Sequence, residues 1–153
     1  MKLNKIQPGE TYLRRQAVEY FLHHPDRIFN RKHPIQIVRC EGFSFSYATI
    51  DGNNRLFVAY LLGLDEVDIP IAKVIDIKGS EDDLDEIAHC IASYEEGVHS
   101  WSDLERRVVS ESEYDHRIYS RMELDEEGCG DGLITLRKIY KPRLSLSKNK
   151  EVG

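Results

Sequence analysis

The chain has 153 residues, of which 41% are hydrophobic and 31% charged, with a formal net charge of −6. This composition predicts a soluble protein with one domain, or with one small domain and an appendage. No run approaches the roughly 18 apolar residues that a membrane helix needs, and no apolar secretory core follows residues 1–5, so we expect a cytoplasmic protein without a membrane partner.

The first predicted element is a helix that opens at residues 8–11 and continues to His23. Its apolar side chains recur at helical spacing on one face, and they are Leu13, Ala17, Tyr20 and Phe21. Pro25 ends the helix, because a proline disfavours helical geometry in the residue before it.

Two strands and a tight turn follow. Residues 35–39 alternate as a strand does, with Ile35 and Ile37 on one side. Gly42 falls in a predicted turn within residues 40–46, and residues 47–50 contain good strand formers. The pattern predicts a β-hairpin.

A glycine turn and a helix come next, and they form the most informative stretch of the chain. Asp51 and Gly52 are a turn signal, apolar residues then recur at helical spacing, and Gly63 is placed to end the helix. A helix start presents unpaired N–H groups and the positive end of the helix dipole, so it attracts anions. Arg55 would add a charged fork for a phosphate. The alternative is that Asp51 caps the helix and Arg55 is a solvated surface charge.

The sequence from Asp51 to Leu56, its apolar helix and the apolar segment 67–74 together resemble the ParB/sulfiredoxin-like superfamily. The resemblance covers roughly residues 34–74. It implies that a nucleotide phosphate (of CTP, ATP or ADP) binds at Gly52, Asn53, Asn54 and Arg55. It also implies that the early helix lies near this turn, which adds Arg14 as a candidate ligand-binding residue.

Departures from the family narrow what this chain is expected to do. Sulfiredoxins have a cysteine nucleophile where this chain has Asn53, so we do not expect sulfinic-acid reduction. Many members have histidine at the position of Asn54, and asparagine cannot transfer protons near neutral pH. The arginine-rich box and downstream DNA reader of partition proteins are not evident either, so the chain is not expected to be a complete partition protein.

Phosphate transfer or hydrolysis at this turn would need a base and a positive group on the phosphates, for which Mg²⁺ is a candidate. Asp51 is the nearest candidate catalytic residue, and Glu41 and Glu10 are more distant ones. The histidines and cysteines show no familiar ligand spacing, so no metal site built from protein ligands alone is expected. The three cysteines are expected to be reduced thiols.

The second half of the chain carries most of the negative charge. Residues 76–131 have 5 Lys/Arg and 18 Asp/Glu, a net charge of −13, whereas residues 1–75 carry +2 and residues 132–153 carry +5. This acidic segment would repel a nucleic-acid backbone, so broad DNA binding is not expected. It is either an ordinary solvated face or a surface for a basic protein partner.

Capping-box patterns at residues 80–83 and 102–105 predict helix starts, and the first of these helices is expected to close at Gly97. Segments that alternate between residues 117 and 140 predict a hairpin around a glycine-rich turn.

The expected fold is α+β, with a small mixed sheet, a central helix after the turn, and a C-terminal helix and hairpin. We divide the chain into a ParB/sulfiredoxin-like core (1–78), an acidic extension of the same domain (79–140) and a basic flexible tail (141–153). The favoured function is nucleotide or phosphate binding with possible weak phosphotransferase or hydrolase activity. The alternative is a non-catalytic interaction module whose residues 76–131 bind or inhibit a basic or nucleic-acid-binding protein.

Overall fold

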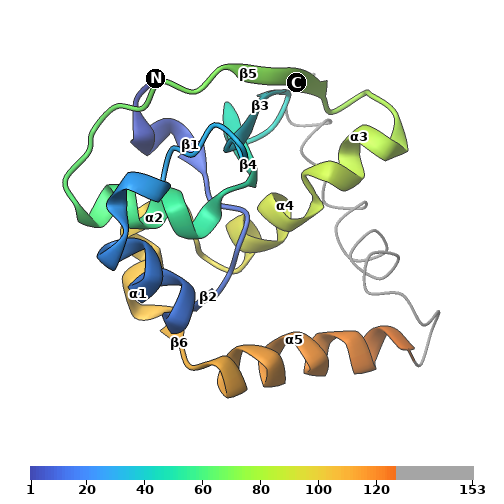
Figure 1. Ribbon diagram of the computed structural model, residues 1–153. Coiled ribbons are helices and arrows are strands. Elements are labelled where there is room, and N and C mark those ends of the chain that lie inside the picture. Colours follow the sequence, from blue (N-terminus) through green and yellow to red (C-terminus); the bar gives the residue numbers. More distant parts are fainter. Residues whose placement is uncertain (127–153) are drawn as a thin grey trace.

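A computed structural model describes residues 1–126 of the chain. Its main sheet has four strands, in the order β1 (Ile6–Gln7), β4 (Tyr47–Asp51), β3 (Gln36–Glu41) and β5 (Ile71–Asp76). Strands β3 and β4 are antiparallel, whereas β1 pairs with β4 and β5 pairs with β3 in parallel. The predicted α+β class with a mixed sheet is therefore confirmed (Figure 1).

The hairpin of β3 and β4 forms the centre of this sheet. Gly42 has a φ of 90°, which suits the predicted turn between the two strands. Val38 and Ala48 face each other across the pair, and both are fully buried. Strand β5 lies at the edge of the sheet and begins directly after Pro70. This position suits a proline, which cannot donate to a strand ladder.

Helix α2 (Asn53–Leu61) follows β4 as predicted, but its N-cap differs from the prediction. The cap residue is Gly52, with a φ of 108°, and no side chain caps the helix. Asp51 is not the cap because its carboxylate points to Arg55, with 3.8 Å between Oδ1 and Nη2. The helix ends before Gly63, which has a φ of 86°.

The predicted helix of residues 8–23 begins later than its periodicity indicated. Helix α1 covers only Arg15–His23, because Leu13–Arg14 form strand β2 and pair in parallel with β6 (Val108–Val109). The backbone N–H of Leu13 also donates to the Arg107 carbonyl at 2.9 Å. Pairing with this distant segment therefore overrides the local helical pattern. Three-residue 3₁₀ turns, η1 (Leu3–Lys5) and η2 (Pro25–Arg27), precede β1 and follow α1.

The helix predicted from Ser80 to Gly97 is divided in two. Ser80 caps α3 (Glu81–Glu86) by accepting from the Asp83 N–H, and α4 (Ala88–Glu95) follows after the fully buried Ile87. Gly97 closes α4 with a φ of 97°.

The second capping box is also shifted from its predicted position. Ser100 and Asp103 form it, and it opens the 3₁₀ helix η3 (Trp101–Arg106). The predicted pair at Ser102 and Glu105 was wrong, because Asp103 Oδ2 accepts from the backbone N–H groups of His99 and Ser100.

Helix α5 (Glu111–Glu126) contradicts the first strand of the hairpin predicted between residues 117 and 140. The Glu113 N–H donates to Ser110 Oγ at the start of this helix, and Glu113 pairs with Arg117 one turn on, so local contacts favour a helix despite the alternation. The rest of that hairpin and the basic tail lie outside the described residues.

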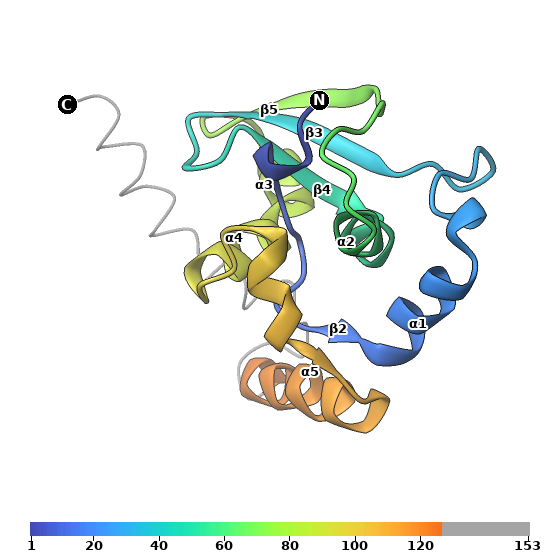
Figure 2. The ribbon, with the colours of Figure 1, turned by 90° about the vertical axis from the view of Figure 1, so that its left-hand side faces the viewer.

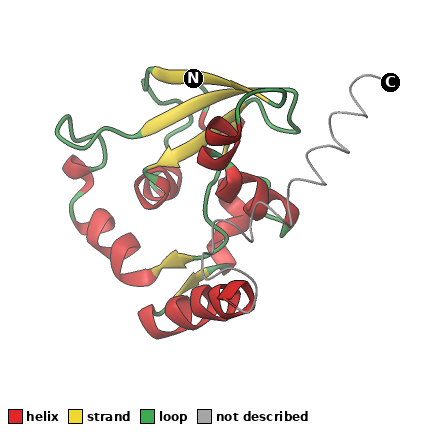
Figure 3. Cartoon of the chain, turned by 90° about the vertical axis from the view of Figure 1, so that its right-hand side faces the viewer, coloured by secondary structure: helices red, strands yellow, loops and turns green. Residues whose placement is uncertain are grey.

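Two apolar clusters hold the elements together. The larger one joins the N-terminal segment, α1, α2 and η3, and its largest buried side chains include Phe57 and Trp101. The smaller one joins β3, β4, β5 and α4 around Val38, Ile75 and Ile91. Figure 2 shows α2 and α4 on the same side of the four-stranded sheet. Figure 3 shows the β2–β6 pair well away from that sheet, next to α5. Within residues 1–126, the structure has no helix that is long and apolar enough to span a membrane.

Candidate functional site

A pocket of about 230 Å³ opens at the start of α2, at the turn that the sequence singled out. Its walls come from β4, the turn and the first residues of α2, with one residue from α1 and one from the N-terminal segment. The lining residues are Glu10, Phe21, Ile50, Asp51, Gly52, Asn53, Asn54 and Arg55. The structure therefore brings together Glu10, Asp51 and all four predicted ligand-binding residues of the turn.

Gly9 is what allows Glu10 to reach this pocket. A Cβ atom at Gly9 would lie 2.7 Å from the Thr49 carbonyl oxygen and 3.1 Å from Cys90 Sγ, so the segment packs closely only because residue 9 is glycine. The Gly9 N–H donates to Asn53 Oδ1 at 2.7 Å. Asn53 thus fixes the N-terminal segment against the start of α2, a positioning contact that the sequence did not indicate.

The N-terminus of α2 is open toward the pocket. The first N–H groups of an α-helix have no partner within the helix, and no side chain caps this one within the part of the chain described. In addition, Asn54 Oδ1 is buried and has no hydrogen-bond partner among the described residues. A buried polar atom without a partner is unusual in a folded protein. The start of α2 therefore retains donors and an acceptor that a ligand could use.

Arg55 is a buried residue rather than a solvated surface charge. It is 8% exposed, and its guanidinium donates to the His33 carbonyl and lies beside Asp51. These contacts tie the loop before β3 to the start of α2. Part of the guanidinium's hydrogen-bonding capacity is thereby used inside the protein. Its positive charge still lies in the wall of the pocket.

Two carboxylates balance that charge. Asp51 is largely exposed and pairs with Arg55, whereas Glu10 accepts a hydrogen bond from the Tyr114 hydroxyl at 3.3 Å. Repulsion from the two carboxylates would weaken the binding of a bare anion. No cluster of three or more metal-ligating side chains occurs within residues 1–126. A Mg²⁺ ion held here would therefore need phosphate oxygens as well as these carboxylates.

Two predicted site residues lie elsewhere. Glu41 is the last residue of β3 and pairs with Arg39 at 3.5 Å, on the wall of a different pocket. Arg14 faces α5, where it pairs with Glu111 at 3.6 Å and lies over the Tyr114 ring. Neither residue lines the pocket at the turn. Arg14 sits in β2 instead of the predicted helix, which explains its different direction.

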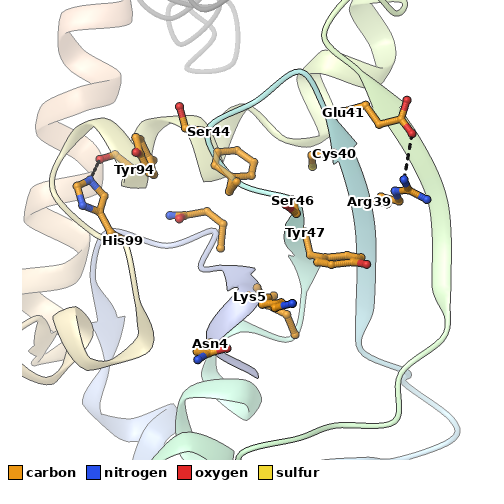
Figure 4. A pocket seen from close by; sticks show the side chains of 13 residues that line it. Asn4, Lys5, Arg39, Cys40, Glu41, Ser44, Ser46, Tyr47, Tyr94 and His99 are labelled. Carbon is orange, nitrogen blue, oxygen red and sulfur yellow. Dashed lines mark hydrogen bonds and ion pairs between the residues drawn. The ribbon is translucent and has the colours of Figure 1, made fainter. Parts of the chain in front are cut away.

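The second pocket is larger, at about 660 Å³, and the sequence did not predict it. Figure 4 shows Tyr94 and His99 on one side, Arg39 and Glu41 on the other, and Asn4 and Lys5 below them. Its residues come from η1, β1, the β3–β4 hairpin and the segment around α4. No local spacing connects such distant positions, so no sequence motif could have revealed the pocket.

Cys40 and Cys90 are buried thiols. Burial raises the pKa of Cys40 to about 12 and raises that of Cys90 further, because a thiolate would lose its hydration. The Cys90 thiol donates to the Thr49 carbonyl at 3.3 Å. Both are therefore protonated at neutral pH and are poor nucleophiles.

Several acidic residues of segment 76–131 have basic partners. Lys73 bridges Asp83 and Glu86, and Arg117 pairs with Glu113 at 2.9 Å. These pairs reduce the negative field of the described part of this segment.

Comparison of the chain with protein-family models, with curated proteins and with solved structures found no match.

Proposed function

We propose that the chain is a ParB/sulfiredoxin-like domain that binds a nucleotide through its phosphate groups at Gly52–Arg55. The observation that carries this proposal is the uncapped N-terminus of α2, which opens onto a pocket of about 230 Å³. Backbone N–H groups and the helix dipole favour a phosphate there. The resemblance of Asp51–Leu56 to the superfamily supports the same position.

In this proposal the backbone of the turn is the main phosphate ligand, and Arg55 contributes charge from behind it. The guanidinium is engaged by His33 and Asp51, so it would act over a short distance rather than as a free bidentate fork. Asn54 Oδ1 is an acceptor without a partner among the described residues, and it would receive a donor group of the ligand.

Mg²⁺ fits the donor set only as part of a nucleotide complex. Asp51 and Glu10 line one pocket, and one or two carboxylates together with phosphate oxygens are a common environment for this ion. The ion would offset the repulsion between these carboxylates and the phosphates. If hydrolysis or transfer occurs, Asp51 is the proposed base, because its carboxylate is exposed at the pocket.

The alternative function, an acidic interaction module of residues 76–131, has less support. Lys73 and Arg117 already neutralise part of the acidic charge. No described feature of this segment indicates which basic partner it would take.

The test is a thermal-shift panel of CTP, ATP, ADP and GTP, each with and without Mg²⁺. A ligand that binds only the folded state raises the apparent melting temperature by mass action. The variant Asn54→Asp adds a negative charge at the pocket and should remove the shift. Asn30→Asp makes the same change in the turn before β3 and should leave it intact.

A nucleotide-specific shift that is lost in Asn54→Asp and kept in Asn30→Asp would support the proposal and justify assays of phosphate release. Asp51→Asn adds a second readout. Because the Asp51 carboxylate is proposed to contact Mg²⁺, this variant should weaken nucleotide binding only in the presence of Mg²⁺. Equal shifts in all variants, or no shift at millimolar nucleotide, would contradict binding at this turn.

A further inference from the structure

The 660 Å³ pocket beside the β3–β4 hairpin has the size of a small-molecule site, which in proteins measures about 300–1,000 Å³. It is lined by segments that are far apart in the sequence, from η1 to the loop after α4. It does not share a lining residue with the pocket at the α2 turn. Its chemistry can therefore be considered separately.

One wall of this pocket is aromatic. Phe45 and Tyr94 have ring centroids 5.9 Å apart, and Tyr94 continues to the His99 ring at 4.3 Å. Phe43 stacks on Phe45 at 5.8 Å but does not line the pocket. Flat rings on a pocket wall favour a planar, aromatic ligand, because stacking buries both surfaces.

The same pocket contains positive charge. The Lys5 side chain is exposed at the pocket, and its Nζ makes no ion pair or hydrogen bond with any residue of the described part of the chain. Arg39 lies with Glu41 across the pocket from Tyr94 and His99, and the side chains of this ion pair are 56% and 48% exposed. An exposed pair of this kind contributes little stability, so the arginine remains accessible to a ligand. A negatively charged group on the ligand would thus form an ion pair with Lys5 without displacing another partner.

Gln7, which also lines this pocket, supplies a hydrogen-bond acceptor. Gln7 is 3% exposed, and its Nε2 donates to the Val98 carbonyl at 2.6 Å and also contacts the Pro8 carbonyl and Ser93 Oγ. These contacts use the amide nitrogen fully, and no group within residues 1–126 donates to Oε1. Unlike Asn54 Oδ1, this oxygen is not one of the fully enclosed side-chain atoms without a partner. An N–H group of a ligand would donate a hydrogen bond to Gln7 Oε1.

We propose that this pocket binds a small planar heterocycle that carries an N–H donor and a negatively charged group, such as a nucleoside monophosphate. The ring stacks on Phe45 and contacts the tilted Tyr94 ring at an angle, the N–H donates to Gln7 Oε1, and the anionic group pairs with Lys5. The proposal stands on these three features and does not depend on phosphate binding at α2.

Isothermal titration of the full chain with AMP and CMP tests the proposal, because each carries a ring, an amino group and a phosphate. Ribose 5-phosphate, which lacks the ring, adenosine, which lacks the phosphate, and purine riboside monophosphate, which lacks the amino group, are the matched controls. Ribose 5-phosphate should bind at least about fivefold more weakly, because stacking of a base is worth about 1–3 kcal/mol. Adenosine and purine riboside monophosphate should each bind about threefold to fivefold more weakly, because each loses one polar contact. Equal binding of AMP and ribose 5-phosphate would overturn the proposal.

Two pairs of variants place the ligand in this pocket. Phe45→Ala should weaken AMP about tenfold, whereas Phe43→Ala, which removes a neighbouring ring outside the pocket, should change it little. Lys5→Gln should weaken AMP about threefold to fivefold, and Lys2→Gln on a different surface should not. If both members of a pair act alike, the pocket is not the site.

Amide chemical shifts separate this site from the turn. AMP should move the signals of residues 40–47 and 94–99, and these changes should persist in Asn54→Asp. Changes confined to residues 51–56 would contradict this inference while supporting the proposed function. No changes at millimolar AMP would contradict this inference alone, since binding at the turn is tested with CTP, ATP, ADP and GTP rather than with AMP.

Discussion

Gly52 and Gly63 lie at the two ends of helix α2, and their surroundings differ in an informative way. Both have positive φ angles, of 108° and 86°. A Cβ atom at Gly52 would lie 2.8 Å from two carbons of Ile35, whereas one at Gly63 would meet nothing within 4 Å. Gly52 therefore serves both the backbone turn and the close approach of Ile35 beneath the candidate pocket.

We predict that Gly52→Ala lowers the free energy of unfolding by about 2–4 kcal/mol, because backbone strain adds to displacement of a buried isoleucine. Gly63→Ala meets only the strain and should lower it by about 1 kcal/mol. Urea denaturation of both variants measures the difference. Equal losses would show that Ile35 adapts freely and that the contact is unimportant.

A second prediction concerns two arginines in different surroundings. Arg55 is buried and bonded to the His33 carbonyl, so Arg55→Ala should lower the free energy of unfolding by about 2 kcal/mol. Arg39 is in an exposed pair with Glu41, and Arg39→Ala should lower it by less than about 1 kcal/mol. Urea denaturation provides the comparison.

If Arg55→Ala were as stable as Arg39→Ala, the contact with the His33 carbonyl would be energetically silent and Arg55 would be free to serve a ligand. If Arg55→Ala instead lowers the free energy of unfolding as expected, Arg55 variants are poor probes of binding. Their effect on ligand affinity could not be separated from their effect on the stability of the fold. This is the reason for testing the site with Asn54→Asp.

At the scale of elements, the 3₁₀ helix η3 depends on the cap that Asp103 forms. Its carboxylate accepts from the N–H groups of His99 and Ser100, and these bonds lower its pKa, with the His99 N–H as the main cause. Asp103→Ala should therefore lower the free energy of unfolding by about 1 kcal/mol. Glu105→Ala, two residues on, should change it by less than about 0.5 kcal/mol.

Denaturant titration near neutral pH and in acid checks this cap further. A carboxyl group with a lowered pKa stabilises the fold above its ordinary pKa of 3.8, and that contribution is lost as the pH falls below this value. The difference between wild type and Asp103→Ala should thus shrink in acid. A difference that does not change with pH would contradict the capping role of the ionised carboxylate.

The elements that the sequence predicted well are those set by local chemistry. The hairpin follows from alternation around Gly42, and the limits of α2 follow from Gly52 and Gly63. The largest shift of a helix start occurs where a distant contact decides. Leu13 and Arg14 leave the predicted helix because β6 pairs with them, and these strands lie about 95 residues apart in the chain.

The residues of the candidate site also differ in whether the sequence could identify them. Residues 51–55 are contiguous, so a motif could identify them, and they do line one pocket. Glu41 and Arg14 could not be placed without knowing which strand and helix they face. The burial of Arg55 could not be predicted from the sequence either, because it depends on a contact with the backbone carbonyl of His33 in a distant loop.

At the scale of the whole molecule, the two buried thiols make stability sensitive to alkali. Burial raises the pKa of Cys40 from 9.0 to about 12, and that of Cys90 is also raised. A group whose pKa is raised in the folded state stabilises the fold below its unfolded pKa and loses this contribution as the pH rises toward the folded value. Stability should therefore decline above about pH 9.

We expect the free energy of unfolding to fall by about 1 kcal/mol per thiol for each pH unit above about 9. Urea denaturation under reducing conditions at several pH values measures the slope. The double variant Cys40→Ala/Cys90→Ala should keep a smaller decline, due to Tyr114, whose pKa is raised to about 12 mainly by burial, and to Tyr60 and Lys73, whose pKa values are also raised by hydrogen bonds to carboxylates. An unchanged slope in the double variant would contradict the role of the thiols.

The contact between Trp101 and Leu3 has a consequence for how the protein is made. Trp101 is the single tryptophan of the chain, and its indole N–H donates to the Leu3 carbonyl at 3.1 Å. During synthesis, almost a hundred residues beyond Leu3 must be completed before this bond can form. The pairing of β2 with β6 requires a similar length of chain. Until then, α2 lacks its packing contacts with η3. The emission of this single tryptophan therefore reports when the two ends of this segment meet, and it can be followed during refolding of the purified chain without any added label.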